Sequence, residues 1–287
     1  MKNDRLAEPD LLKGTGYVMV AFFSMAIFGV CIKLATADVS KIWISFFIYL
    51  TAFLSSIPYV WRVGFDVFKT KYPSYHVGRM IFGLSASCLY IVALNHLPLV
   101  NAALLFYTTP LFIPFLAVPM LNESVSKHIW WAVVLGFIGI AIIIKPNSQI
   151  FLEPGNIIGL LSGFCLAVAY IFIKKLSPVE KISRIVFLFF FLATLIQVPF
   201  LFFADFLPPL TNLFYAFIAG VCFLISQIFL AKAYEYAPAA KIGVFQYFTI
   251  LYVAIFDWLL WNKVLSLVDL IGALLIIVAG VIIIKMR

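Results

Sequence analysis

The chain has 287 residues, of which 65% are hydrophobic and 11% charged, and its formal net charge is +8. Its mean hydropathy is +1.13. A soluble protein of this length could not hide so much apolar surface in one core, whereas lipid solvates it directly. The composition therefore excludes a soluble globular protein and predicts an all-α integral membrane protein.

The predicted elements are apolar spans of roughly 20 residues, the length at which a helix crosses a hydrocarbon core of about 30 Å. Short connectors between several of them predict antiparallel neighbouring helices. In chain order we predict ten transmembrane helices, over residues 14–34, 43–60, 78–95, 100–121, 129–145, 156–174, 184–203, 212–232, 241–261 and 267–285.

The second half of the chain is a diverged copy of the first. At an offset of 140 residues the two halves carry the same residue at several positions: Pro98 and Pro238, Tyr107 and Tyr247, Thr109 and Thr249, Asn122 and Asn262. An odd number of crossings per copy reverses the second copy in the membrane. We therefore predict two inverted five-helix repeats, 14–146 and 155–287, with a tail at 1–13 and a connecting loop at 147–154. Inverted repeats are the construction of secondary transporters.

The placement of the basic residues predicts the orientation. If the N-terminus is cytoplasmic, sixteen of the 20 Lys and Arg residues lie on the cytoplasmic side, as the positive-inside rule requires. We therefore predict that both termini are cytoplasmic and that the basic excess reflects topology rather than nucleic-acid binding. Lys33 and Lys174 occupy matched positions at span ends, where we expect their ammonium groups to reach the membrane interface.

The sequence gives no sign of a cofactor or a catalytic centre. Its four cysteines lie in apolar spans without the spacing of a metal site or a disulfide framework. Motifs for dinucleotide binding, the P-loop, zinc proteases and the nucleophile elbow are absent. We therefore predict no metal, no cofactor and no enzymatic activity, and we exclude a self-contained ATP-driven pump.

Polar side chains inside the spans are the strongest functional indication, because in the membrane each must face a partner or a cavity. On the ninth span, Gln246, Thr249 and Asp257 follow one another on one helical face, which predicts a helix that lines a cavity. The alternative is that these groups satisfy one another between helices. The complete predicted substrate-binding set is Ser87, Tyr90, Tyr107, Thr109, Tyr170, Gln227, Gln246, Tyr247 and Thr249.

The fourth span contains Pro110, Pro114 and Pro119, which remove backbone donors and bend or loosen a helix. Broken helices at matched positions in the two halves are typical of transporter sites. The aligned ninth span has no proline, so the sequence predicts a break in the first half alone. A static kink and a moving gate are both consistent with it.

Asp257 is the only acid well within a predicted span. We regard it as a candidate for proton coupling, since protonation would let it move cheaply between exposed and occluded states. The alternative is an interfacial carboxylate that pairs with Lys263 or with water. Glu123 lies at a span end, where we expect it to act as an interfacial cap.

The residues between the third and fifth spans resemble the drug/metabolite transporter superfamily, particularly its bacterial EamA-type permeases. The resemblance is carried by Tyr90, Ala93-Leu94, Leu97-Pro98, Ala102-Ala103, Pro110-Leu111 and Leu121-Asn122-Glu123. It implies a bacterial inner-membrane protein that works by alternating access around a cavity lined by the first, third, fourth, sixth, eighth and ninth spans. It also implies substrates that range from amino acids and nucleotide sugars to amines and drugs.

We therefore predict a secondary active transporter, monomeric or homodimeric in the lipid bilayer, for a small polar or zwitterionic metabolite such as an amino-acid or nucleoside derivative. Coupling to protons or to an exchanged substrate is expected. Because few buried charges line the predicted set, a strongly anionic substrate would need Lys232 or Lys241 near the cytoplasmic mouth. The alternatives are a broad-specificity amine or drug exporter of the same fold, a membrane-embedded enzyme and a non-transporting scaffold.

Overall fold

A computed structural model of the chain describes residues 10–35, 39, 41–61, 64–97, 99–145, 155–204, 206–262 and 266–285. The predicted connecting loop at 147–154 and Lys263 lie outside these residues, as does most of the predicted tail at 1–13. Within the described residues, ten segments are long and apolar enough to cross a membrane, which agrees with the predicted number. A helix satisfies its own backbone polar groups, which lipid cannot do.

Every regular element of the described residues is helical. The first half contains α1 (Leu11–Ala35), α2 (Lys41–Val60), η1 (Gly64–Phe68), α3 (Pro73–His96), α4 (Leu99–Phe106), α5 (Thr109–Leu121) and α6 (Lys127–Ile144). The second half contains α7 (Gly155–Leu176), α8 (Ile182–Gln197), η3 (Val198–Phe203), α9 (Leu210–Tyr236), α10 (Ala239–Val244), η4 (Phe245–Tyr247), α11 (Phe248–Trp261) and α12 (Leu267–Lys285).

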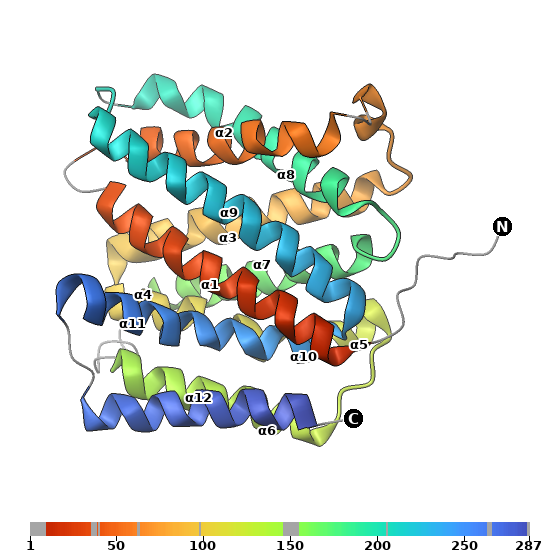
Figure 1. The fold of residues 1–287 in the computed structure, drawn as a ribbon, viewed down its shortest axis with the longest axis vertical. Helices are drawn as coiled ribbons and strands as arrows, with labels where there is room; N and C mark the ends of the chain where they lie inside the picture. The colour runs from red at the N-terminus through yellow and green to blue at the C-terminus, as the bar shows by residue number, and fades with distance from the viewer. Residues whose placement is uncertain are drawn as a thin grey trace.

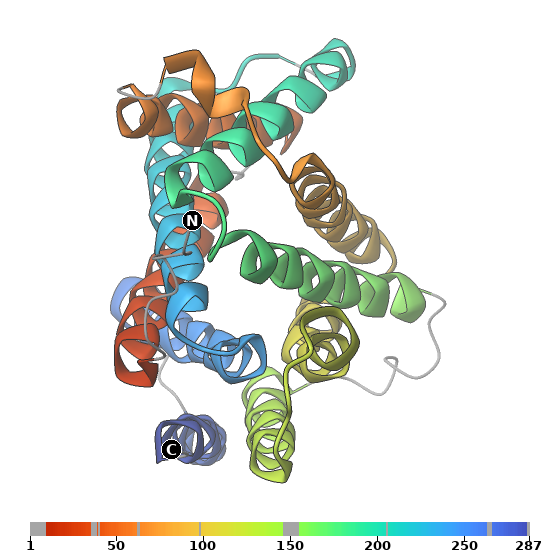
Figure 2. The same cartoon turned by 90° about the vertical axis from the view of Figure 1, so that its right-hand side faces the viewer.

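The helices form a bundle in which the two halves are interleaved (Figure 1). α2 and α8 pack together at one end of the long axis, and α6 and α12 pack together at the other. Between these pairs, α1 packs along α9 and α3 packs along α7. Figure 2 shows α1 and α9 on one flank of the bundle and α3 on the other. The first span of each half therefore packs against the third span of the other half.

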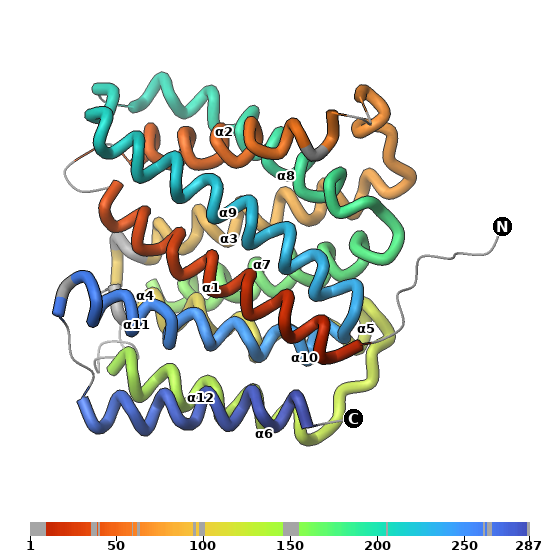
Figure 3. The backbone as a smooth tube through the Cα atoms, in the orientation of Figure 1, coloured from red at the N-terminus to blue at the C-terminus, as the bar shows by residue number. Residues whose placement is uncertain are grey.

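α1 begins and α12 ends on the same side of the bundle, at the right of Figures 1 and 3. We call this the terminal side, and the other the opposite side. α3 begins on the terminal side at Pro73, five residues before the predicted span. Proline suits a first helical turn, where its missing N–H is not needed. The early start places Arg79 in the second turn of the helix instead of at its edge.

The fourth and ninth spans are both broken, and at matched positions. α4 ends at Phe106 and α5 begins at Thr109, while α10 and α11 are separated by the 3-10 segment Phe245–Tyr247. The prediction of a break in the first half alone is therefore wrong. Proline is one route to a break, but a backbone tightened into a 3-10 turn within a helix is another and often marks a functional hinge.

The same two spans end alike. Asn122 ends α5 with φ 54°, and Asn262 ends α11 with φ 52°. Their backbone N–H groups donate to the carbonyls of Ala117 and Asp257, which are also aligned at an offset of 140. Asparagine tolerates this left-handed conformation better than most residues, which explains why it stands at both ends.

Candidate functional site

A cavity of about 80 Å³ lies among the two broken spans, α3, α7 and α9. Six of the nine residues predicted from sequence line it: Ser87, Tyr107, Tyr170, Gln227, Gln246 and Thr249. The first, third, fourth, sixth, eighth and ninth spans all contribute, as the family resemblance implied. α2 and α8 each add an aromatic side chain, Tyr49 and Phe189.

The other three predicted residues do not line the cavity. The Tyr90 ring packs 4.9 Å from the ring of Phe106, which does line it. The Thr109 hydroxyl is used within the fold, because it donates to the carbonyls of Phe106 (2.8 Å) and Gly163 (3.1 Å). Tyr247 is fully buried in the apolar core. Tyr90 and Thr109 thus contact the lining residue Phe106, and Tyr247 belongs to the core.

Arg79 is the cavity residue that sequence reasoning missed. It is 3% exposed, and its guanidinium carbon lies 4.2 Å from the centre of the Phe189 ring. Its Nη2 donates to Oε1 of Gln227 at 2.8 Å, and its Nε has no hydrogen-bond partner in the described part of the chain. The lining described thus has few buried charges, as expected, but Arg79 is missing from the predicted set.

One pattern in the sequence could have identified Arg79. Arg79, Gly83 and Ser87 follow at steps of four, and all three line the cavity. Residues at that spacing share one helical face. Because the predicted third span begins at residue 78, the sequence places Arg79 at the edge of that span, among the basic residues of the cytoplasmic side.

The second broken span presents unsatisfied polar groups to the cavity. Gln246 and Thr249 are each 3% exposed, and neither Oε1 of Gln246 nor Oγ1 of Thr249 has a hydrogen-bond partner among the described residues. A buried polar group without a partner costs about 1–3 kcal/mol. The cost is relieved when a ligand or water supplies the missing partner.

On the terminal side of the bundle, contacts from the first half and from α7 hold the junction of α9 and α10. The Glu123 carboxylate accepts from the backbone N–H of Ala239 at 2.9 and 3.0 Å, which caps the start of α10. Burial raises the pKa of Glu123 above its ordinary value, although this hydrogen bond and nearby Lys174 oppose the shift. The carboxylate therefore caps a helix, as expected, but a different helix from its own.

Lys174 binds at the same junction of α9 and α10. Its Nζ donates to the carbonyls of Tyr234 (2.7 Å) and Ala237 (2.8 Å) at the end of α9. A cation is favourable at a helix C-terminus, where carbonyls lack partners within the helix. Its ammonium group therefore binds the end of α9, and its position relative to the membrane interface stays a prediction.

A second network on the terminal side joins the two halves. Thr70 donates to the carboxylate of Glu180 at 2.5 Å, and Arg184 pairs with the same carboxylate. Arg184 also donates to the carbonyls of Asp66 and Val67, both at 3.1 Å. The connection between α2 and α3 is thereby tied to the start of α8.

The opposite side carries a looser contact. Lys33 Nζ lies 3.4 Å from Oδ1 of Asp257, and their side chains are 51% and 31% exposed. Lys33 joins the end of α1 to α11 in this way. Asp257 is therefore paired, but with Lys33 of the other half, while the predicted partner Lys263 lies outside the described residues. Proton coupling at Asp257 stays a prediction.

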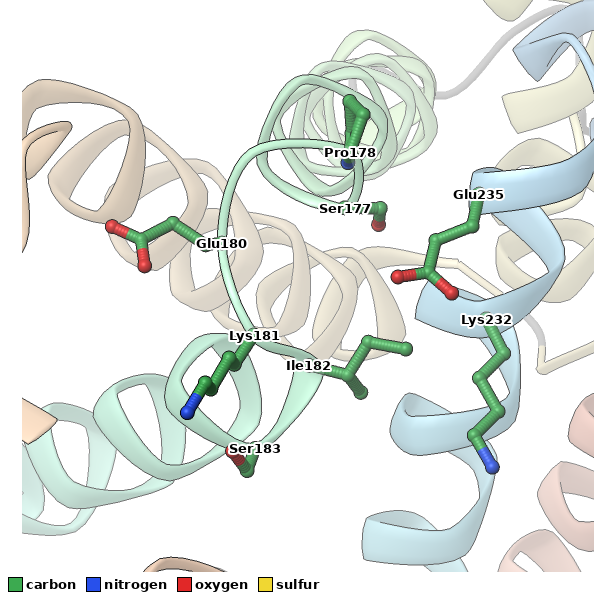
Figure 4. A pocket seen from close by; sticks show the side chains of 8 residues that line it. All are labelled: Ser177, Pro178, Glu180, Lys181, Ile182, Ser183, Lys232 and Glu235. Carbon is green, nitrogen blue, oxygen red and sulfur yellow. The ribbon is translucent and has the colours of Figure 1, made fainter. Parts of the chain in front are cut away.

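A larger hollow, of about 280 Å³, lies on the terminal side between the α7–α8 connection and the end of α9. Figure 4 shows that the Glu180 side chain points away from it, toward the contacts with Thr70 and Arg184. The Lys232 ammonium lies over the rings of Tyr17 (5.6 Å) and Phe229 (5.3 Å). Of the charged residues around this hollow, Glu180 and Lys232 are thus engaged elsewhere, and we assign the candidate site to the central cavity, which six of the predicted residues line. In the described residues no cluster of metal-ligating side chains occurs.

A bundle of ten membrane-crossing segments around a buried polar cavity defines an integral membrane transport protein. The chain belongs to the EamA-like transporter family, whose model matches residues 12–145 and again residues 153–285. It is therefore a transporter of the drug/metabolite type and not an enzyme.

Three relatives are similar over 80–95% of their length. The pseudopaline exporter CntI of Pseudomonas aeruginosa (strain UCBPP-PA14) is 29% identical over 94% of this chain and 95% of its own. The S-adenosylmethionine uptake transporter of Rickettsia bellii is 25% identical, over 94% and 93%. The riboflavin transporter of Rhizobium johnstonii is 28% identical, over 84% and 80%. A solved crystal structure matches with a TM-score of 0.82 at 14% identity, over 96% and 98%, which shows the common fold.

Proposed function

We propose that the protein is a secondary active transporter of the bacterial inner membrane that moves a small polar or zwitterionic metabolite by alternating access. The observation that carries the proposal is the central cavity, where buried Arg79, Gln246 and Thr249 each have a polar atom without a partner among the described residues. The relatives include an exporter and uptake transporters, so the direction of transport does not follow from them.

The halves of the chain support alternating access. Each half matches the family model separately, and the cavity lies where their broken spans meet. Its volume of about 80 Å³ is below the roughly 300–1,000 Å³ of pockets that enclose drug-sized ligands. We infer that the cavity widens when the cargo enters, and that the contacts of Glu123 and Lys174 on the terminal side break and form again in each cycle. Both termini are cytoplasmic in this proposal.

An exporter of cationic amines or drugs fits the site less well. Seven aromatic rings line the cavity and could hold a cation: Phe22, Tyr49, Phe106, Tyr107, Tyr170, Phe189 and Phe223. However, the one formal charge among the described lining residues is positive, that of Arg79. A cargo with only positive charge would be repelled within a site of low dielectric constant.

Alternating access is testable before the cargo is known. The four native cysteines (Cys31, Cys88, Cys165 and Cys222) are replaced by alanine, Ser87→Cys is introduced, and the protein is reconstituted into vesicles. A membrane-impermeant thiol reagent is then added to one side or to both. A carrier exposes Ser87→Cys to each side in turn, so labelling is expected from either side, whereas a scaffold with a fixed cavity allows labelling from at most one side.

A thermal-stabilisation screen of the purified protein against amino acids, nucleosides and their derivatives then identifies the cargo. Uptake of that compound into vesicles is expected to fall about tenfold in Gln246→Ala, which loses a hydrogen bond of about 1.4 kcal/mol, without loss of expression. Unchanged uptake would remove Gln246 from the site.

A further inference from the structure

We infer that the cargo carries a carboxylate and that Arg79 is the residue that binds it, an inference that rests on the proposed transport through the central cavity. The starting point is the free-energy cost of burying an arginine. A cation buried within a membrane-spanning helix is costly, and a buried charge is normally paired. Arg79 is 3% exposed.

No carboxylate among the described residues compensates this charge. The ion pairs found in that part of the chain involve Lys13, Lys33, Lys69, Lys145 and Arg184, and none involves Arg79. Among the described lining residues there is no acid. The guanidinium is held by one hydrogen bond to Gln227 and by the Phe189 ring, which orient it without neutralising it.

The geometry leaves the guanidinium able to bind a ligand. An arginine side chain has five N–H donors, and the described residues give a hydrogen-bond acceptor to the Nη2 group alone. The remaining donors form the planar fork that matches a carboxylate with two parallel hydrogen bonds. Gln227 is a positioning residue in this arrangement, because its amide oxygen fixes the fork from the side.

The charge of the cavity selects a monoanion. One arginine balances one negative charge, and a phosphate group with nearly two negative charges would remain uncompensated in a site whose described lining has no second cation. The rest of the cargo meets Gln246, Thr249 and the aromatic rings. An amino group could lie against those rings, which makes a zwitterion with a carboxylate at Arg79 compatible with the whole lining.

Acetate is the probe that tests this inference, because it is small enough for the cavity as it stands. Thermal unfolding of the purified protein is measured in sodium acetate, in sodium chloride of the same ionic strength, in sodium phosphate and in acetamide, the neutral isostere of acetate. We expect stabilisation that saturates with acetate and exceeds that of the other three. Equal effects of acetate, chloride and acetamide would overturn the inference, and a larger effect of phosphate would overturn the choice of a carboxylate.

Variants locate the site. Arg79→Met combined with Gln227→Leu is expected to raise the unfolding temperature of the empty protein, because an uncompensated buried charge is removed, and to weaken acetate binding at least about 30-fold. Arg79→Lys keeps the charge but not the fork and is expected to bind acetate with intermediate strength. Lys232→Met is the matched control and should leave the acetate response unchanged. A response lost in Lys232→Met and kept in the Arg79 variants would place the anion site at the terminal-side hollow and overturn the inference.

Failure of this inference and failure of the proposed function give different results. If Ser87→Cys is labelled from each side in turn but acetate has no specific effect, the protein is a carrier whose cargo is not a carboxylate. If acetate binds through Arg79 but Ser87→Cys is labelled from one side alone, the anion site is real and alternating access is wrong.

Discussion

The two broken helices of this protein differ in what their breaks leave unsatisfied. Between α4 and α5, the Thr108 hydroxyl donates to the carbonyl of Leu105 at 2.5 Å, and the Thr109 hydroxyl donates to the carbonyls of Phe106 and Gly163. Between α10 and α11, Gln246, Tyr247 and Thr249 each keep a buried side-chain oxygen without a partner within the described residues.

We infer from this difference that the first break has a structural role and that the second, at the matched position, has a functional one. Proline next to the first break removes backbone donors, and the threonines there satisfy the carbonyls that a regular helix would have used. The second break needs no such repair, because its backbone continues as a 3-10 turn. Gln246 and Thr249, which line the cavity, are therefore free for a ligand, and we expect mutations at the first break to affect stability and mutations at these two residues to affect transport.

The largest expected effect comes from filling the space behind the first break. In Gly163→Ala the added methyl group would lie 2.6 Å from Oγ1 of Thr108 and 2.8 Å from the carbonyl oxygen of Leu105. Neither group can move without giving up its hydrogen bond. We expect the variant to lose about 1–3 kcal/mol of unfolding free energy, measured by denaturant unfolding in detergent.

The control for this variant is Gly29→Ala, where an added methyl group meets nothing within 4 Å. Alanine is also a better helix former than glycine, by about 1 kcal/mol. Gly29→Ala should therefore be as stable as the native protein or more so. Equal stability of the two variants would show that the first break does not pack closely against Gly163.

The next largest effect is expected at Thr109 and Thr249, the aligned threonines of the two breaks. Thr109→Val removes a hydroxyl that makes two hydrogen bonds, so we expect it to lower the unfolding free energy by about 1 kcal/mol and to leave uptake unchanged. Thr249→Val removes an unpartnered hydroxyl, so we expect unchanged or higher stability and uptake lowered about tenfold. If Thr249→Val destabilises as much as Thr109→Val and transports normally, the comparison fails.

A smaller effect is expected at the far ends of the same two helices, where Ala117 aligns with Asp257. Asp257→Asn breaks an ion pair with Lys33 that is partly exposed, which should change the unfolding free energy by less than about 1 kcal/mol. If Asp257 couples protons, uptake in this variant should no longer respond to a pH gradient, while Lys33→Gln, which keeps the acid, should still respond. An identical response of Asp257→Asn and the native protein would exclude the coupling role.

The smallest effect concerns the pH dependence of stability at Glu123, which follows α5 and caps the start of α10. Burial raises the pKa of Glu123 in the folded protein, so its stabilising contribution is complete below the ordinary glutamate pKa and is lost as pH rises through the raised value. Glu123→Gln keeps an acceptor for the N–H of Ala239 but does not titrate. We expect the unfolding temperature of Glu123→Gln relative to the native protein to rise as the pH increases from the ordinary glutamate pKa through the raised one, and a difference that stays constant would contradict the shift.

The sequence by itself determined the class of protein, the number of membrane spans and most of the polar lining. These follow from short-range patterns: apolar runs long enough to cross a bilayer, and polar residues such as Gln246 and Thr249 at helical spacing within them. Such patterns depend on the chain's own periodicity and need no knowledge of which helices are neighbours.

Tertiary structure alone decided which polar groups are satisfied. Thr109 and Thr249 are the same residue at aligned positions, yet Gly163 accepts a hydrogen bond from the first and nothing accepts one from the second in the described structure. From the sequence, Arg79 is a basic residue near a span end, where an interfacial position is expected. The packing of α3 against α7 and α8 instead buries it beside Phe189. A partner distant in sequence determines whether a polar side chain is bonded or free, so spacing within one helix could not reveal it.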